Sequence, residues 1–146
     1  MKNNTSNLAG FTRVHFNDIF MTVRKATIDF SKSAIDTIGK PRYVNALIDE
    51  EGKRFAIQTF DKANHDHSSA IEFFVPPEPG KQEKVRWASV YTTKMLMELA
   101  GVEDFEAFFK DLNTDKDDEN KKKNKGIRFY GKYIEDENAI IFDMQT

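Results

Sequence analysis

The chain has 146 residues, 39% of them hydrophobic, and a formal net charge of −2, which corresponds to about one typical domain and is far from the charge of a polybasic nucleic-acid protein. The lack of any Cys excludes disulfides, thiolate catalysis and Cys-ligated zinc. The polar segment 1–10 and the lack of an apolar run near ~18 residues predict neither a signal peptide nor a membrane helix, so we expect a cytoplasmic protein without membrane partners.

The chain begins with two segments of extended character. Residues 11–16 alternate weakly in polarity and predict a strand or a docked arm. Residues 19–30 alternate more clearly, so we expect one continuous strand with Phe20 on one face and Met21 on the other. A helix of about two turns follows, because Ser31 is a suitable N-cap and Gly39 a suitable terminating residue.

A hairpin is predicted next. Residues 43–48 and 54–60 are strand-like, and we expect Gly52 to take the positive φ of the acidic turn between them. Residues 61–69 are polar and predict a loop, and 71–75 predict a short apolar strand.

The second half repeats this alternation of strand and helix. Residues 85–91 predict a strand, and Thr92 or Thr93 can cap a helix that runs to Ala100 and stops at Gly101. The next helix, 104–112, carries an apolar stripe at helical spacing, formed by Phe105, Phe108, Phe109 and Leu112.

The last part of the chain contains a charged segment and a hairpin. Residues 113–125 are almost wholly charged or polar and predict a mobile surface loop. Residues 127–134 and 139–144 predict a closing hairpin, with Asn138 at its turn.

An internal repeat is the most specific pattern in the sequence. Without a gap, residues 23–39 overlay residues 85–101, so that Lys32 meets Lys94 and Gly39 meets Gly101. We therefore expect two tandem strand–helix–hairpin units, which together form one compact α+β domain, a small mixed sheet or barrel built as a pseudo-dimer. The units are residues 1–75 and 81–146, the linker is 76–80, and the second unit carries an insertion at 102–126.

Residues 26–35 predict a strand that leads into a short capped helix, and residues 43–54 predict a hairpin with an acidic turn. This arrangement resembles the SpoVT/AbrB-like swapped-hairpin family, which includes antitoxins of the MazE type. The resemblance implies that two units interlock as one small barrel, which binds DNA through basic residues. Two units in one chain could then form this barrel as a monomer, and a homodimer is the alternative.

The predicted nucleic-acid surface lies mainly in the first unit. Cations near the ends of its helix would meet phosphate together with helix N–H groups, and the second unit has equivalent positions. The candidate binding residues are Arg24, Lys25, Lys32, Lys40, Arg42, Arg86 and Lys94. An ordinary charged surface remains the alternative interpretation.

No catalytic motif is present in the sequence. The acidic clusters 49–51 and 135–137 fall at predicted turns, where neither burial nor a cleft would raise a carboxylate pKa. The segment His65-Asp66-His67 offers alternating metal ligands, but no third ligand is fixed by spacing, and a polar turn is the alternative. We expect no cofactor, no metal and no enzymatic activity.

Three functions from different classes remain open, and the third is an enzyme, although no catalytic motif supports it. The first is a DNA-binding regulator of the SpoVT/AbrB-like kind, from a bacterium or a phage. The second is a protein-binding inhibitor or adaptor, such as a phage-encoded blocker of a host enzyme. The second half favours the latter because it holds twelve Lys and Arg against sixteen Asp and Glu, without a strong basic stripe.

Overall fold

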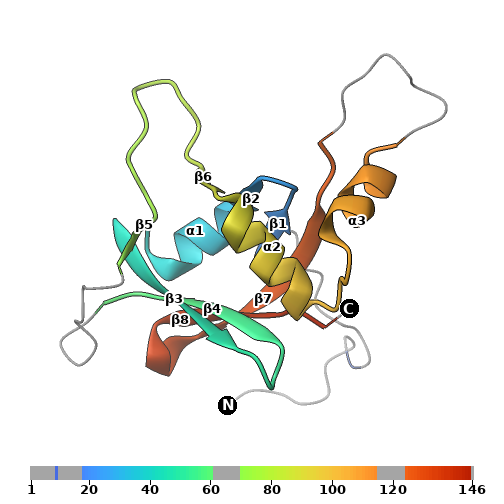
Figure 1. The fold of residues 1–146 in the computed structure, drawn as a ribbon. Helices are drawn as coiled ribbons and strands as arrows, with labels where there is room; N and C mark the ends of the chain where they lie inside the picture. Colours follow the sequence, from blue (N-terminus) through green and yellow to red (C-terminus); the bar gives the residue numbers. More distant parts are fainter. Residues whose placement is uncertain (1–8, 10–17, 61–69, 115–123, 146) are drawn as a thin grey trace.

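The computed structural model describes residues 9, 18–60, 70–114 and 124–145. Within them, eight strands form one strongly curled sheet, a half-barrel with three short α-helices (Figure 1). The strands are β1 (Phe20–Val23), β2 (Thr27–Phe30), β3 (Tyr43–Asp49), β4 (Arg54–Gln58), β5 (Ile71–Glu72), β6 (Val85–Ala88), β7 (Ile127–Ile134) and β8 (Ala139–Asp143). The helices are α1 (Lys32–Ile38), α2 (Val90–Leu99) and α3 (Phe105–Leu112). The expected strand-rich α+β fold is confirmed.

The strands of the two sequence halves alternate within this one sheet. Its order is β5-β3-β4-β8-β7-β1-β2-β6, and every neighbouring pair is antiparallel. The first half therefore supplies both β5–β3–β4 and β1–β2, and β8 and β7 of the second half lie between them. Helix α1 packs against β1, β7 and β8, and buries Ala34, Ile35 and Ile38.

The prediction of one continuous strand over 19–30 is wrong. The chain turns back at residues 24–26, where the Arg24 N–H donates to the Thr27 oxygen at 2.8 Å, and β1 and β2 pair as a hairpin. The turn shifts the alternation, so that Met21 and Ile28 are buried together although the sequence pattern placed them on opposite faces. A reversal in the middle of an alternating segment thus changes which side chains face the core.

The predicted helix caps are confirmed for α1 and in part for α2. The Ser31 hydroxyl accepts from the Ala34 N–H, and Gly39 ends α1 in the left-handed region at φ 92°. Helix α2 begins earlier than predicted, because Ser89 rather than Thr92 or Thr93 is its N-cap and accepts from the Thr92 N–H. Strand β6 consequently ends at Ala88, and residues 89–91 do not belong to it.

The structure does not confirm the duplication. The ungapped overlay matches Ser31 with Thr93, whereas the residue that caps α2 is Ser89. It also matches the end of β2 with residues 90–92, which lie in the first turn of α2. Both units consist of a strand, one Ser and then a helix. This similarity aligns Ser31 with Ser89, and not with Thr93 as in the ungapped overlay.

Both predicted hairpins are present, with one change at the first turn. The positive φ, 54°, belongs to Lys53 and not to Gly52. The Gly52 N–H donates to the Asp49 carboxylate at 3.0 Å, and a Cβ added at Gly52 would make that carboxylate shift. In the second turn Asn138 has a φ of 51°, as predicted.

Aromatic side chains from distant strands form the core. The Phe30 ring contacts Phe73, Trp87 and Phe142, and Phe55 stacks on Phe142 at 6.1 Å. The apolar stripe of α3 also packs inward, with Phe105 and Phe109 buried, and Phe108 and Leu112 half-buried against the core. The predicted strand at 71–75 is only Ile71–Glu72, and the linker 76–80 has no regular secondary structure.

Three predictions concern segments beyond the described residues. They are the strand or arm at 11–16, the loop at 61–69 with His65-Asp66-His67, and most of the charged loop at 113–125.

Candidate functional site

The two ends of the sheet approach each other. Strands β5 and β6 are the outermost strands, and the curl of the sheet brings them to the same side of the molecule (Figure 1). The Trp87 indole Nε1 on β6 donates to the backbone oxygen of Glu72 on β5 at 3.1 Å. The half-barrel is therefore bridged at this point by one side chain rather than by strand pairing.

Among the described residues, strand β3 is left partly unpaired beside this bridge. β5 has only two residues, which pair with Tyr43 and Val44. The Phe73 N–H donates to the Arg42 oxygen at 2.7 Å, so the backbone groups of Arg42 and then of every second residue face the β5 side. The N–H and C=O groups of Ala46 and Ile48 consequently face that side beyond the end of β5.

Strand β6 presents a second edge, on the other side of the gap, that no strand of the described part of the chain pairs with. The Ser89 N–H donates to the Ala26 oxygen at 3.1 Å, which places Trp87 and Val85 in the hydrogen-bonded pairs with β2. The backbone groups of Arg86 and Ala88 therefore face away from β2 and toward the gap.

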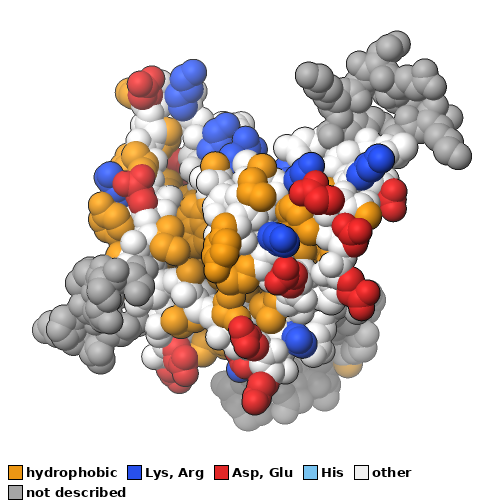
Figure 2. Space-filling view, in the orientation of Figure 1, with side chains coloured by type: hydrophobic (Ala, Val, Ile, Leu, Met, Phe, Trp, Pro, Cys, Tyr) orange, Lys and Arg blue, Asp and Glu red, His pale blue; other side chains and the backbone are white. Residues whose placement is uncertain are grey.

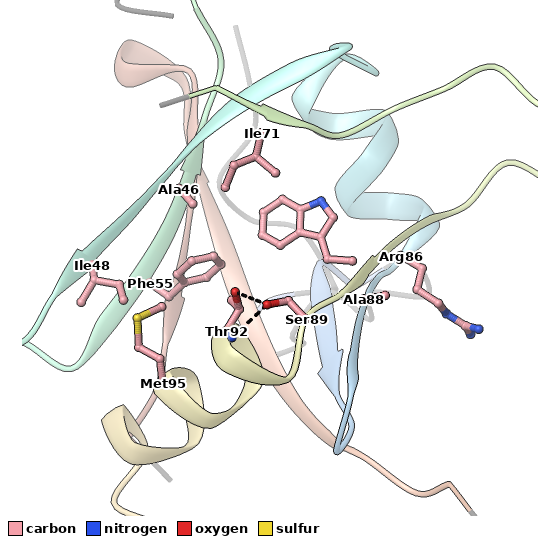
Figure 3. A pocket seen from close by; sticks show the side chains of 10 residues that line it. Ala46, Ile48, Phe55, Ile71, Arg86, Ala88, Ser89, Thr92 and Met95 are labelled. Atoms are coloured by element: carbon pink, nitrogen blue, oxygen red, sulfur yellow. Dashed lines mark hydrogen bonds between the residues drawn. The ribbon is translucent and has the colours of Figure 1, made fainter. Parts of the chain in front are cut away.

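A pocket of about 390 Å³ lies between these two edges. We call it the open-edge groove; it is lined by Ala46, Ile48, Phe55, Ile71, Arg86, Trp87, Ala88, Ser89, Thr92 and Met95. Figure 3 shows Ile71, Phe55 and Met95 converging on it from β5, β4 and α2, whereas the Arg86 side chain points away. Its polar lining includes the hydroxyls of Ser89 and Thr92, which lie 2.9 Å apart.

Apolar side chains continue from the groove onto the surface. Ile48 and Ile71 are exposed at its rim, and Val90 and Tyr91 are exposed in the first turn of α2, beside the groove residues Ser89 and Thr92. The side chain of Tyr91 is 80% exposed. Figure 2 shows hydrophobic side chains gathered over this region, with charged side chains around it. A contiguous exposed apolar patch of this kind marks a binding surface more often than a scattered apolar residue does.

The structure brings four of the predicted nucleic-acid-binding residues together as two pairs, and the two cations of each pair share a carboxylate. Arg24 and Arg86 both pair with Asp29 on the sheet. Lys32 and Lys40, at the two ends of α1, both pair with Glu83 at 3.2 and 2.9 Å and with Asp36. The hydrogen bonds from Lys40 and Lys32 hold the pKa of Glu83 below its ordinary value, and Glu83 in turn raises the pKa of Lys32.

The other predicted cations lie apart from these clusters. Lys25 pairs with Glu106 at 3.0 Å, and Arg42 pairs with Glu72 at 2.9 Å, which raises the pKa of Arg42. Lys94 lies exposed on α2, and among the described residues it forms no ion pair. Thus six of the seven predicted contacts are already matched by carboxylates, and they form no single basic surface.

Sequence analysis missed the open-edge groove. Its only sequence signal is the run Trp87 to Tyr91, in which apolar side chains continue past a strand end into the exposed start of a helix. In the part of the chain that the structure describes, no group of three His, Cys, Asp or Glu residues is placed to hold a metal ion. No described helix is long and apolar enough to cross a membrane.

No protein-family model, no curated protein and no solved structure matches this chain.

Proposed function

We propose that this chain is a non-enzymatic protein-binding inhibitor or adaptor, and that its partner docks on the open-edge groove and the apolar side chains beside it. The observation that carries the proposal is the apolar pocket between the two free edges of the sheet, lined by Ile48, Ile71 and Trp87. Apolar area that is exposed in the free protein and covered in a complex is a main source of binding free energy.

The charge distribution supports a protein partner over DNA. Arg24, Arg86, Lys32 and Lys40 each already pair with a carboxylate, which offsets part of the positive charge that a phosphate would meet. Nucleic-acid affinity depends on cations that exchange small counterions for phosphate, and a carboxylate beside the cation reduces that gain. DNA binding stays a prediction from the family resemblance, and it becomes one outcome of the test below.

Asp49 in the first acidic turn supports the non-enzymatic part of the proposal. Asp49 accepts hydrogen bonds from the Gly52 N–H and from Arg54, and both lower its pKa. A general acid needs a raised pKa in an enclosed site. The arrangement at Asp49 stabilises the ionised carboxylate, which is the opposite shift, and it shapes the turn.

The test is a capture experiment from a lysate of the source cells, with quantitative mass spectrometry of the captured proteins. Tyr91→Ala removes the most exposed aromatic ring beside the groove, and Tyr130→Ala is the matched control, because Tyr130 is exposed on β7. Nuclease treatment and a salt series are applied to all three proteins.

The proposal predicts a partner that is retained after nuclease and at high salt, kept by Tyr130→Ala and lost with Tyr91→Ala. Capture that disappears with nuclease and falls steeply with salt would support the DNA function instead. Capture that is equal for both Tyr variants would place the interface elsewhere on the molecule.

A further inference from the structure

The open-edge groove exposes backbone groups as well as apolar side chains. Ala46 and Ile48 on β3 and Arg86 and Ala88 on β6 line the same pocket, and the N–H and C=O groups of all four point away from the strands that pair with β3 and β6 on their other sides, β4 and β2. An unpaired strand edge is a template for another extended chain. Here two such edges border one pocket, and an apolar ligand without a backbone would leave both unpaired.

The sheet already shows how a strand lies in this position. β5 occupies the same interval between β3 and β6, runs antiparallel to β3, and accepts the Trp87 hydrogen bond from the β6 side. It begins at Ile71, one of the residues that line the groove, and the segment 61–69 that precedes it lies outside the described residues. A segment placed in the groove alongside Ala46 and Ile48 would continue that line.

Side-chain alternation sets which residues of such a segment enter the pocket. In an antiparallel pair, directly opposite residues point to the same face. Because Ala46 and Ile48 both line the pocket, the two residues opposite them, two positions apart, would point into it as well. The pocket walls there are Phe55, Trp87 and Met95, which favours apolar side chains at both positions.

The charges at one end of the groove indicate which residue type the amino-terminal end of the bound segment carries. A smaller cavity next to it shares Ile48 and Met95, and is also lined by Glu50 and Glu98, with Lys53 as its one cation. Glu50 and Glu98 form no ion pair within the described residues. An antiparallel segment passes Ile48 before Ala46, so its amino-terminal end lies at this acidic end.

We propose that the groove binds an extended segment of the partner protein as an added strand, antiparallel to β3. The segment has the pattern basic–x–apolar–x–apolar, and the basic residue lies near Glu50 and Glu98. This inference rests on the proposed function, and it adds the binding mode, the direction and the sequence class of the partner segment. Strand addition of this kind takes affinity from main-chain hydrogen bonds and specificity from alternate side chains.

The chain offers a sensitive probe, because its one Trp, Trp87, lines the groove. Peptides are selected on the full chain from a phage-displayed library of random dodecapeptides. Each enriched peptide is then synthesised, and its affinity is measured from the change in Trp87 fluorescence.

Three variants separate the backbone contribution from the side-chain contribution. Ala88→Pro removes an N–H that faces the gap, at an exposed position where β2 does not need that N–H, and Ala88→Val keeps it as the matched control. Ile48→Asp places a charge in the pocket. Circular dichroism confirms that each variant is folded.

The proposal predicts that enriched peptides share the alternating pattern with a basic residue on the amino-terminal side and lack Pro within it. It predicts that Ala88→Pro weakens binding about tenfold, as for the loss of about one hydrogen bond, while Ala88→Val changes it little. Replacing the basic residue of the peptide should weaken binding less in a Glu50→Gln/Glu98→Gln double variant than in the parent.

Other outcomes overturn the inference in distinguishable ways. Peptides that bind Ala88→Pro as well as the parent, but fail to bind Ile48→Asp, contradict strand addition and leave the proposed function standing. If the library yields no enriched peptide but the lysate yields a partner that depends on Tyr91, strand addition is again contradicted and the proposed function stands. If the parent is a dimer in solution and Ala88→Pro is a monomer, the strand comes from a second copy of this chain. If there is neither a peptide nor a partner that depends on Tyr91, both proposals fail.

Discussion

The indole of Trp87 donates a hydrogen bond to the backbone oxygen of Glu72, and this contact joins the two outermost strands of an eight-stranded sheet. The same ring contacts Phe30 on β2, Phe55 on β4 and Phe73, which follows β5. One side chain therefore serves as a core residue, as the bridge across the open barrel and as a wall of the groove.

Replacement of Trp87 by Phe should destabilise the protein by about 2 kcal/mol. The change removes the indole N–H, leaves the Glu72 oxygen without this donor, and removes part of a ring packed on three Phe side chains. Urea denaturation followed by circular dichroism measures the loss. Tyr91→Phe is the control and should change the free energy of unfolding by less than about 0.5 kcal/mol, because Tyr91 is largely exposed. Equal effects of the two changes would show that the bridge contributes nothing.

Two Thr hydroxyls form a matched pair for a second prediction. The Thr27 Oγ1 is buried and has no hydrogen-bond partner among the described residues, whereas the Thr93 Oγ1 donates to the Lys25 oxygen at 2.8 Å or the Val90 oxygen at 2.9 Å. Thr27→Val should therefore leave stability unchanged or raise it by about 1 kcal/mol, and Thr93→Val should lower it by about 1–2 kcal/mol. Thermal unfolding of both variants checks the order. A loss at Thr27 as large as at Thr93 would mean that the Thr27 hydroxyl has a partner.

The two Ser caps should differ in strength. The Ser31 hydroxyl accepts from the N–H groups of Ala34 and Phe20, both at 3.1 Å, so it joins α1 to β1 as well as capping the helix. The Ser89 hydroxyl accepts from the N–H of Thr92 within its own helix. We expect Ser31→Ala to cost about 2 kcal/mol and Ser89→Ala about 1 kcal/mol. Denaturant titration of both variants gives the difference, and a reversed order would contradict this account of Ser31.

Glu83 carries a pH prediction. Its pKa lies below the ordinary value of 4.5 because Lys40 and Lys32 donate hydrogen bonds to its carboxylate. A lowered pKa in the folded state means that the contribution of Glu83 to stability is fully present above the unfolded value of about 4.5 and is lost as the pH falls through the folded value.

NMR titration of the Glu83 carboxyl carbon measures this shift directly. Its midpoint should lie below 4.5 in the parent and move upward in Lys40→Ala. Lys94→Ala is the control, since Lys94 forms no ion pair among the described residues. A parent midpoint at or above 4.5 would show that the Lys–Glu83 contacts do not persist in solution.

Local signals explain which elements the sequence predicted. Helix α1 could be placed because Ser31 and Gly39 form hydrogen bonds with the backbone at the two ends of the same helix. Both hairpin turns could be placed because they contain acidic residues together with Gly or Asn, which tolerate a positive φ. The turn between β1 and β2 was missed because Arg24-Lys25-Ala26 contains no Gly, Pro, Asn or Asp, and the alternation of residues on either side continues through it.

Long-range contacts explain what the sequence did not predict. The cations of the candidate DNA surface were identified, and Asp29 and Asp36 lie close to Arg24 and Lys32 in the chain, but other partners are distant: Asp29 and Arg86 are 57 positions apart, and Lys40 and Glu83 are 43 apart. The groove depends on β5 and β6 being the outermost strands, and on β5 stopping after two residues. Neither property has a local signature, since the strand order is set by packing of the whole sheet.

Hydrogen exchange at the free edges tests the central claim most directly. Amide exchange of Ala46, Ile48, Arg86 and Ala88 is measured by NMR in the free chain and with a saturating peptide from the selected set. The account predicts that these four amides exchange fast in the free chain and are protected at least about tenfold in the complex, while the amide of Trp87, already paired with β2, changes little. A peptide that binds and shifts Trp87 fluorescence, but leaves all four amides unprotected, would contradict strand addition at the groove.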